Sequence, residues 1–155
     1  MIRIGIPGAQ PLEIAHLLLD YNGTIACDGM LKEGVAARLA ALCANLQVHV
    51  LTADTYGSVA HQCRGIAPVH VIGKENQAEQ KLEYLHSLGA LSCIAIGNGK
   101  NDALMLSEAA LGFAVVQEEG VCTQSLLASD VLFRSIEEAL DALLHPTRLA
   151  ATLRS

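Results

Sequence analysis

Short runs of apolar residues recur along the chain, and longer segments of mixed polarity separate them. Continuous apolar runs of this kind are typical of strands buried on both faces, as in a parallel sheet covered by crossover helices. The pattern therefore predicts an α/β fold with a mostly parallel central sheet. The predicted strands are 14–19, 47–52, 68–72, 92–96, 112–116 and 130–133.

The segments between these strands have the apolar periodicity of helices. In 75–88, for example, Ala78, Leu82 and Leu85 fall on one face, and Gly89 follows as a natural C-terminal stop. Helices on both faces of the sheet would give a three-layer α/β/α sandwich of the Rossmannoid type. The predicted helices are 32–44, 57–64, 75–88, 100–109, 121–128 and 135–144.

The two ends of the chain depart from this alternation. Residues 2–6 alternate in polarity before a Pro-Gly pair, so we expect them to pair with 14–19 as an antiparallel edge. The tail 146–155 has no evident partner and is expected to be loosely packed. Because the sequence has no internal repeat or break in composition, residues 1–155 are predicted to form one domain. Only one helix is predicted between the first two strands, which leaves no room for a sizeable cap.

The composition, 52% apolar and 17% charged, is that of a packed globular protein. A net charge of -6 without any Lys/Arg cluster argues against nucleic acid as a partner. We expect a cytoplasmic protein with no membrane partner, because no segment resembles a transmembrane helix or a signal peptide. The five cysteines contain no C-x-x-C pair and are interpreted as reduced thiols, and the six histidines lack metal-ligand spacing.

Polar side chains follow three of the predicted strands at the point where each strand ends. In LLLDYNGTIACDG the first strand ends at Asp20, and Thr52 ends the second strand. The fourth strand is followed by GNGKND, residues 97–102. Since the carboxyl ends of parallel strands meet at one edge of a sheet, we expect these hydroxyls, amides and carboxylates to converge in one crevice.

Taken in order, these motifs resemble those of the haloacid dehalogenase (HAD) superfamily of phosphohydrolases and phosphotransferases. LLLDYNGTIA resembles its first motif, VHVLTAD its second, a helix-borne lysine its third and IAIGNGKNDALMLSEA its fourth. DYNGT and GNGKNDALML look most similar to the phosphorylation domain of P-type ATPases and to small soluble proteins that share its signatures. The resemblance covers most of the chain and implies a small HAD-like domain that lacks a sizeable cap.

Phosphoryl transfer gives each of these positions a chemical role. Asp20 is the predicted nucleophile and would form an aspartyl-phosphate, while a tight turn, a hydroxyl and a lysine would contact the phosphoryl oxygens. Mg²⁺, the expected cofactor, prefers oxygen ligands. The predicted catalytic residues are Asp20, Asn22, Thr52 and Lys81; the predicted substrate-binding residues are Gly23, Thr24, Thr52, Ala53, Lys81 and Asn101; and the predicted metal ligands are Asp20, Asn22 through its backbone carbonyl, Asn98 and Asp102.

Two lysines are candidates for the third motif. Lys81 lies 16 residues before Gly97, a spacing that resembles the P-type proteins, and Lys74 lies 23 residues before it, as in some other branches. We favour Lys81.

Two asparagines depart from the usual HAD pattern. Phosphatases of the superfamily carry an aspartate two residues after the nucleophile, where it protonates the leaving group and activates water, and here that residue is Asn22. The loss of a general acid typically lowers a rate by about 10²- to 10⁴-fold. Asn98 stands where the common form has a metal-binding carboxylate, which implies weak Mg²⁺ affinity. The prediction is a Mg²⁺-dependent phosphohydrolase or phosphotransferase that turns over a small phosphorylated substrate slowly.

The sequence leaves two alternatives open. The same two asparagines also favour a catalytically impaired module that binds phosphate or Mg²⁺ and regulates or scaffolds a partner. Without a cap the site would be open unless another subunit covers it, so homo-oligomerisation is a further possibility.

Overall fold

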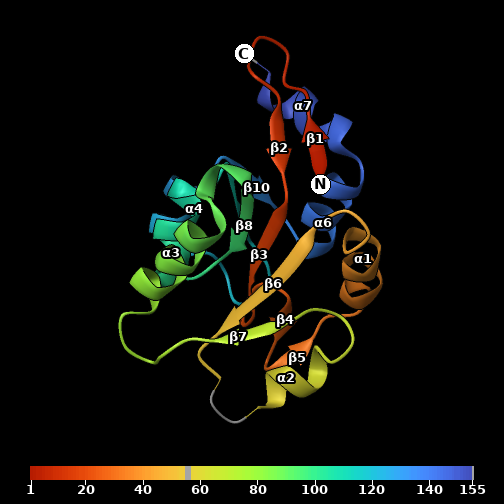
Figure 1. Cartoon of the computed structure of the whole chain (residues 1–155). Helices are drawn as coiled ribbons and strands as arrows, with labels where there is room; N and C mark the ends of the chain where they lie inside the picture. Colours follow the sequence, from red (N-terminus) through yellow and green to blue (C-terminus); the bar gives the residue numbers. More distant parts are fainter. Residues whose placement is uncertain (55–56, 155) are drawn as a thin grey trace.

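A six-stranded parallel sheet forms the centre of the computed structural model, which describes residues 1–54 and 57–154 (Figure 1). The strand order is β10-β9-β8-β3-β6-β7, and all five neighbouring pairs are parallel. This confirms the predicted α/β class. The strands are β3 (His16–Asp20), β6 (Gln47–Thr52), β7 (Val69–Val71), β8 (Cys93–Gly97), β9 (Leu111–Val115) and β10 (Val131–Phe133).

Helices cover both faces of this sheet and bury two apolar clusters. Successive residues of β3 point to opposite faces, so Leu17 and Leu19 belong to one cluster and Leu18 to the other. The larger cluster takes residues from α1 (Val35–Leu42), α2 (Ser58–Gln62), α6 (Ile136–Leu144) and α7 (Pro146–Leu153). The smaller cluster takes residues from α3 (Gln77–Leu88) and α4 (Ala103–Glu108), and α5 (Thr123–Ala128) lies beside α4. The predicted three-layer α/β/α sandwich is therefore present.

Short elements extend this framework. The predicted helix 100–109 begins as a 3₁₀ turn, η2 (Lys100–Asp102), before α4, and a second 3₁₀ turn, η1 (Ala90–Ser92), precedes β8. A small antiparallel hairpin of β4 (Ala26–Cys27) and β5 (Met30–Leu31) follows the first motif. The sequence pattern did not predict this hairpin, whose strands are only two residues long.

The amino-terminal stretch pairs differently from the prediction. β1 (Ile2–Ile4) pairs antiparallel with β2 (Leu12–Ile14), so the predicted antiparallel pairing is present but only Ile14 of the predicted partner 14–19 takes part in it. The physical reason is that β3 is an inner strand whose two edges are already hydrogen-bonded to β6 and β8. The ribbon of β1 and β2 therefore projects from the main sheet (Figure 1).

The tail forms a helix where loose packing was expected. Pro146 stands in the first turn of α7, where its fixed φ suits a helix start. Leu149 is only 1% exposed, and α7 packs against α6 and β1. The expectation of a loose tail is thus wrong for 146–153, because a buried leucine anchors it. Ser155 lies outside the described residues.

All five cysteines are free thiols, as the sequence predicts. Within residues 1–54 and 57–154, no helix combines the length and the apolar character needed to cross a bilayer.

Candidate active site

A cleft of about 460 Å³ opens at the carboxyl edge of the sheet, beside the ends of β3, β6 and β8. The expected convergence of the three motifs is therefore present in the structure. Most of the predicted site residues line the cleft, and Lys74 stands exposed at its rim. The lining residues that the sequence predicted are Asp20, Asn22, Thr52, Ala53, Lys81, Asn98 and Asn101.

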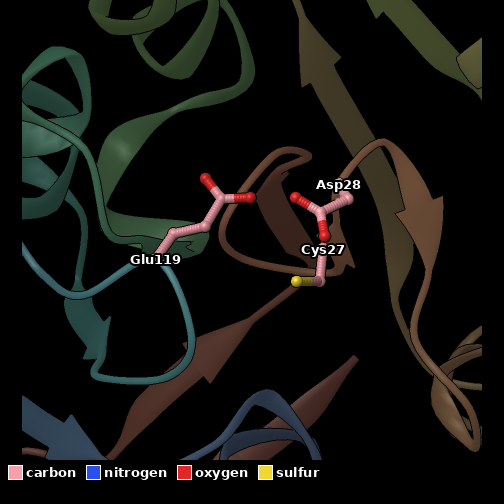
Figure 2. Close-up of side chains that lie close together, drawn as sticks. All are labelled: Cys27, Asp28 and Glu119. Atoms are coloured by element: carbon pink, nitrogen blue, oxygen red, sulfur yellow. The ribbon is translucent and has the colours of Figure 1, made fainter.

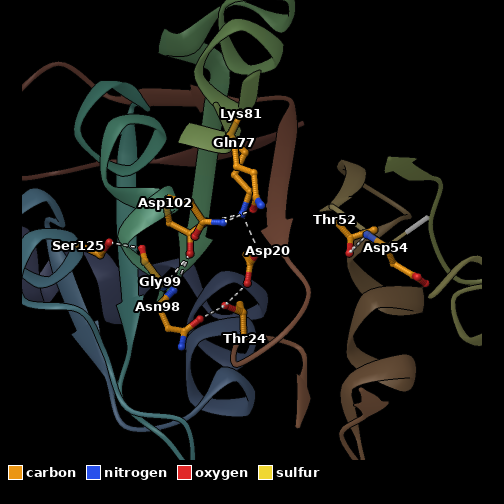
Figure 3. Close-up of polar contacts among 11 residues, drawn as sticks. Asp20, Thr24, Thr52, Asp54, Gln77, Lys81, Asn98, Gly99, Asp102 and Ser125 are labelled. Carbon is orange, nitrogen blue, oxygen red and sulfur yellow. Dashed lines mark hydrogen bonds and ion pairs between the residues drawn. The ribbon is translucent and has the colours of Figure 1, made fainter. Parts of the chain in front are cut away.

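Lys81 links the first and fourth motifs at the floor of the cleft (Figure 3). Its Nζ donates to Asp20 Oδ1 and to Asp102 Oδ1, each at 2.6 Å. The lysine is 1% exposed although it comes from the middle of α3, a helix with mostly polar residues. Of the two candidate lysines, Lys81 is thus the one that contacts the carboxylates.

Burial and charge set the protonation of this triad. Burial and the neighbouring charge of Asp102 raise the pKa of Asp20 to about 7, although contacts with Lys81 and Thr24 oppose the shift. Burial alone would lower the pKa of Lys81, but the two carboxylates outweigh it and hold that pKa above its ordinary range. With one cation and two carboxylates, the formal charge of the ionised triad is -1.

Thr24 connects Asp20 to the fourth motif. Its hydroxyl lies 3.3 Å from Asp20 Oδ2 and 3.2 Å from Asn98 Oδ1. Gly23, in the same turn, has a φ of 76°, and a Cβ at that position would collide with the Asn98 amide. Glycine therefore lets these two loops approach closely. Gly23 and Thr24 support the site from below the cleft surface.

Asp102 is fully buried and organises the loop that follows β8. Its Oδ2 accepts hydrogen bonds from the backbone amides of Asn98 at 3.0 Å and Gly99 at 2.8 Å, while Lys81 occupies Oδ1. Asn101, also in this loop, donates from Nδ2 to Gln77 Oε1 at 2.7 Å and so ties the loop to α3. The fourth motif is therefore held by side chains of its own sequence and by α3.

Thr52 and Asp54 form the other wall of the cleft (Figure 3). The Thr52 hydroxyl accepts from the Asp54 amide at 3.2 Å and is 3% exposed. Asp54 accepts from the Ser58 hydroxyl at 2.7 Å and from the Val59 amide at 2.9 Å, at the start of α2. Asp54 thus stabilises a helix terminus, and it was not predicted to be catalytic.

The oxygen atoms around Asp20 suit a hard divalent cation. Because Asp20 Oδ2 and Asn98 Oδ1 both approach the Thr24 hydroxyl, one carboxylate oxygen and one amide oxygen lie on the same side of the site. Asn22, whose carbonyl was predicted as a third ligand, lines the same cleft. These residues fit an oxygen-liganded cation such as Mg²⁺. Both Asp102 oxygens already accept hydrogen bonds, so Asp102 suits a supporting role better than direct ligation.

Two further residues support the site, and the sequence motifs did not reveal them. Gln117 donates from Nε2 to the carbonyls of Gly23 at 2.9 Å and Thr24 at 2.6 Å, and its Oε1 accepts from the Ile136 amide at 3.0 Å. Ser125, fully buried on α5, donates to the Gly99 carbonyl (Figure 3). In the sequence, Gln117 is marked only by its position just after a predicted strand, and Ser125 only by its position within a predicted helix.

Beside this cleft, Cys27, Asp28 and Glu119 lie close enough together for their ligand atoms to fall within 4.8 Å of one another (Figure 2). Asp28 and Glu119 are exposed, and Glu119 also lines the cleft. The cluster therefore adds negative charge at the mouth of the candidate site.

No protein-family model matches the chain. Two shorter proteins of the archaeon Methanocaldococcus jannaschii are similar in sequence. MJ0073 is 39% identical over 90 residues, which cover 54% of this chain and 97% of MJ0073. MJ0072 is 54% identical over 39 residues, which cover 25% of this chain and 89% of MJ0072. The chain belongs to the same family as MJ0073.

Solved structures show which fold the chain adopts. The chain matches a 3-deoxy-D-manno-octulosonate 8-phosphate phosphatase from Moraxella catarrhalis with a TM-score of 0.71 and 17% identity, covering 91% of this chain and 94% of that one. The protein has the HAD fold. The corresponding phosphatase from Haemophilus influenzae also gives a TM-score of 0.71, at 16% identity and with 92% and 94% of the two chains covered. A Legionella pneumophila protein assigned to HAD subfamily III A gives 0.72 at 18% identity, with 90% and 86% covered.

The similarity to these HAD structures extends over nearly the whole chain and confirms the fold that the four motifs imply. The compared structures do not test the closer resemblance to P-type ATPase phosphorylation domains, which stays a sequence-based prediction.

Proposed function

We propose that the protein is a divalent-metal-dependent phosphohydrolase or phosphotransferase that acts on a small phosphorylated substrate through phospho-Asp20. One observation carries the proposal: a buried lysine holds two carboxylates from different motifs at the open edge of the sheet. Burying three charged groups costs free energy of desolvation unless the groups pair with one another or with a ligand. A phosphoryl group beside Asp20 would give Lys81 an anionic partner.

The chain's own residues supply most parts of the transfer. An Asp20 carboxylate oxygen would attack phosphorus, and the bond from phosphorus to the leaving oxygen would break. Lys81 and the Thr52 hydroxyl would contact phosphoryl oxygens and stabilise the charge that develops on them. A bound divalent cation would add further positive charge against those oxygens. Water or another acceptor would then attack the phosphorus and release Asp20.

Asn22 limits this chemistry. It cannot give a proton to the leaving oxygen or take one from water, so both protons must be exchanged with solvent. The loss of a general acid and base corresponds to about 3–5 kcal/mol of barrier. We therefore expect slow hydrolysis of the acyl phosphate and low turnover.

The similar phosphatases support the class of reaction and the need for a metal. The M. catarrhalis structure holds magnesium and phosphate ions, and the H. influenzae structure holds cobalt. We propose Mg²⁺ for this chain because the oxygen atoms near Asp20 suit a hard cation. With a formal charge of -1 on the triad, the affinity should be weak.

Beryllofluoride, which mimics an acyl phosphate, tests whether the site is built for phospho-Asp20. With Mg²⁺ and BeF₃⁻, the melting temperature of the wild type should rise, and that of Asp20→Asn should not, because a ligand that binds only the folded state stabilises it. Glu13→Gln removes an exposed carboxylate on β2, away from the cleft, and serves as the control, which should respond like the wild type. A wild type that does not respond would refute an acyl-phosphate site.

The second candidate function is a catalytically impaired module that binds phosphate or Mg²⁺ and regulates a partner. The neutral Asn22 and Asn98 favour it. Release of phosphate from p-nitrophenyl phosphate at millimolar Mg²⁺ separates the two functions, with Asp20→Asn as the blank. Turnover that disappears in the variant supports the enzyme, and a response to BeF₃⁻ without any turnover supports the binding module.

A further inference from the structure

A second hollow adjoins the catalytic cleft. It measures about 590 Å³, lies between α3 and the start of α4, and shares Lys74, Gln77 and Asn101 with the cleft. The hydrogen bond between Asn101 and Gln77 therefore belongs to the boundary between the two spaces. A molecule whose phosphate group lies at Asp20 could extend across this boundary into the second hollow.

The second hollow has a positive balance of charge in an otherwise acidic protein. Lys74 and Lys100 line it, and Glu79 is the one acidic residue among the described residues of its lining. The chain as a whole has 16 acidic and 10 basic residues. Within the described part of the chain, no carboxylate forms an ion pair with Lys100, whereas Lys32 and Arg38 each have one. Lys100 is thus available to an anionic ligand.

The rest of the lining suits a short carbon skeleton. Ala78, Ala103 and Leu104 give the hollow apolar surface, and Leu104 is 38% exposed there. Apolar surface together with a few charged groups is the usual arrangement of a small-molecule site. Lysine acts as a compact point charge, so the pair would accept a carboxylate or a second phosphate.

We propose that the second hollow binds the leaving group of the substrate, and that this group carries a second anionic charge recognised by Lys74 and Lys100. The inference rests on the proposed function and narrows it. The substrate class becomes phosphate esters whose alcohol bears a carboxylate or another phosphate at its far end.

Three-carbon esters that differ only at the far end test the proposal. 3-Phosphoglycerate ends in a carboxylate, glycerol 1,3-bisphosphate ends in a phosphate, and glycerol 3-phosphate ends in a neutral hydroxymethyl group. The readout is the ratio of kcat/KM for each charged ester to that for glycerol 3-phosphate, measured within one protein. In the wild type at least one ratio should reach about 3- to 10-fold, as for an exposed charge-assisted contact. The larger ratio identifies the second anion.

Substitutions test whether the two lysines cause the preference for the charged esters. Lys100→Gln and Lys74→Gln should each lower the ratio toward one, and Glu79→Gln should raise it, because it removes the acidic residue of the hollow. Arg64→Gln loses an exposed cation elsewhere on the surface and should leave the ratio unchanged. Added salt should reduce the wild-type preference, since exposed charges are screened.

The possible outcomes distinguish a failure of the anionic subsite from a failure of the proposed phosphohydrolase function. A wild type that releases phosphate from p-nitrophenyl phosphate but shows no preference for either charged ester would refute the anionic subsite and leave the enzyme standing. A preference that survives both lysine substitutions would also refute it. A wild type that hydrolyses none of the four esters would overturn the phosphohydrolase function, and the subsite with it.

Discussion

Lys81 is the residue that holds the candidate site together in the absence of a ligand. It brings a positive charge to a place where Asp20 and Asp102 would otherwise face each other without compensation. Double contacts of 2.6 Å from a fully buried ammonium fix the relative positions of the first and fourth motifs. The same group is therefore important for both stability and the proposed chemistry.

Replacing Lys81 with methionine should destabilise the protein in a pH-dependent way. The raised pKa of Asp20, about 7 against an ordinary 3.8, means that the folded state holds a proton there that the unfolded state releases, so stability falls as pH rises through 7. Without the lysine this effect grows. We expect a loss of about 3–5 kcal/mol at pH 8 and a smaller loss at pH 5, measured by urea unfolding.

Lys32→Met is the matched control for that experiment. Lys32 pairs with the exposed Glu118, so its loss should change the free energy of unfolding by about 1 kcal/mol or less. An equal loss at pH 5 and pH 8 for Lys81→Met would contradict the assignment of the pH effect to the unpaired carboxylates.

Substituting Asn22 tests whether the lack of a general acid limits turnover. Asn22→Asp places a carboxyl group where the HAD phosphatases that the sequence motifs resemble are expected to carry one, and the position lines the cleft. We expect phosphate release from an aryl phosphate to rise by up to about 10²-fold, the lower end of what a general acid provides. An unchanged or lower rate, with the melting temperature preserved, would show that the asparagine does not limit turnover.

The site was predictable from the sequence to the extent that strand ends reveal it. Asp20 and Thr52 directly end apolar runs, and Asn98 follows another, so parallel pairing alone brings them to one edge. Gln117 could not be found in this way, since it reaches Gly23 across 94 positions of the chain. The contacts of such a residue depend on the packing of loops, which has no periodicity.

Among the larger elements, α3 contacts both the cleft and the sheet. It supports the cleft and also packs on the sheet through polar groups. Tyr84 Oη lies 2.9 Å from His49 Nδ1 and 2.7 Å from His70 Nε2, and His49 Nε2 lies 3.1 Å from His16 Nδ1. This chain crosses the three neighbouring strands β3, β6 and β7. Burial lowers the pKa of all three histidines, and that of His49 to about 4.

The histidine chain should make the protein sensitive to acid. A histidine whose pKa is lower in the folded state is protonated first in the unfolded state, so stability is lost as pH falls from about 6.5 toward 4. His49, only 7% exposed, should account for roughly 2–3 kcal/mol of this loss. In His49→Gln the stability difference from the wild type should therefore shrink between pH 7 and pH 4.5, as measured by urea unfolding.

His61 is exposed and lies outside this network, so His61→Gln is the matched control for the histidine substitution. If both variants behave alike, buried neutral histidine is not the source of the acid sensitivity. The Asp20 contribution runs in the opposite direction but is common to all three proteins, and it cancels in the comparison.

Strands and helices were predictable where apolar residues repeat at a fixed spacing. The strand 47–52 matches β6 in full, and the predicted helix 75–88 matches α3 within two residues. The pairing of β1 was not predictable in the same way, because alternation identifies a strand but does not identify its neighbour. The hairpin of β4 and β5 was missed because two-residue strands are too short to show alternation.

Across the molecule as a whole, the tail helix closes one side of the larger apolar cluster. Leu149→Ala should lower the free energy of unfolding by about 2–5 kcal/mol, the cost of a cavity at a well-packed leucine. Leu91→Ala, at a position that is 85% exposed, should cost about 0.5 kcal/mol or less. Chemical denaturation of the intact chain measures both, and equal losses would show that α7 is not part of the core.

The direction of β3 places the two ends of the molecule in different surroundings. The strand runs from the β1–β2 ribbon toward the cleft, and the amino terminus lies on the ribbon side, as does α7 (Figure 1). A fluorescent tag, a fused enzyme or a surface anchor could therefore be attached at the amino terminus without standing over the candidate site. Molecules immobilised through this end would present the cleft to the bulk liquid.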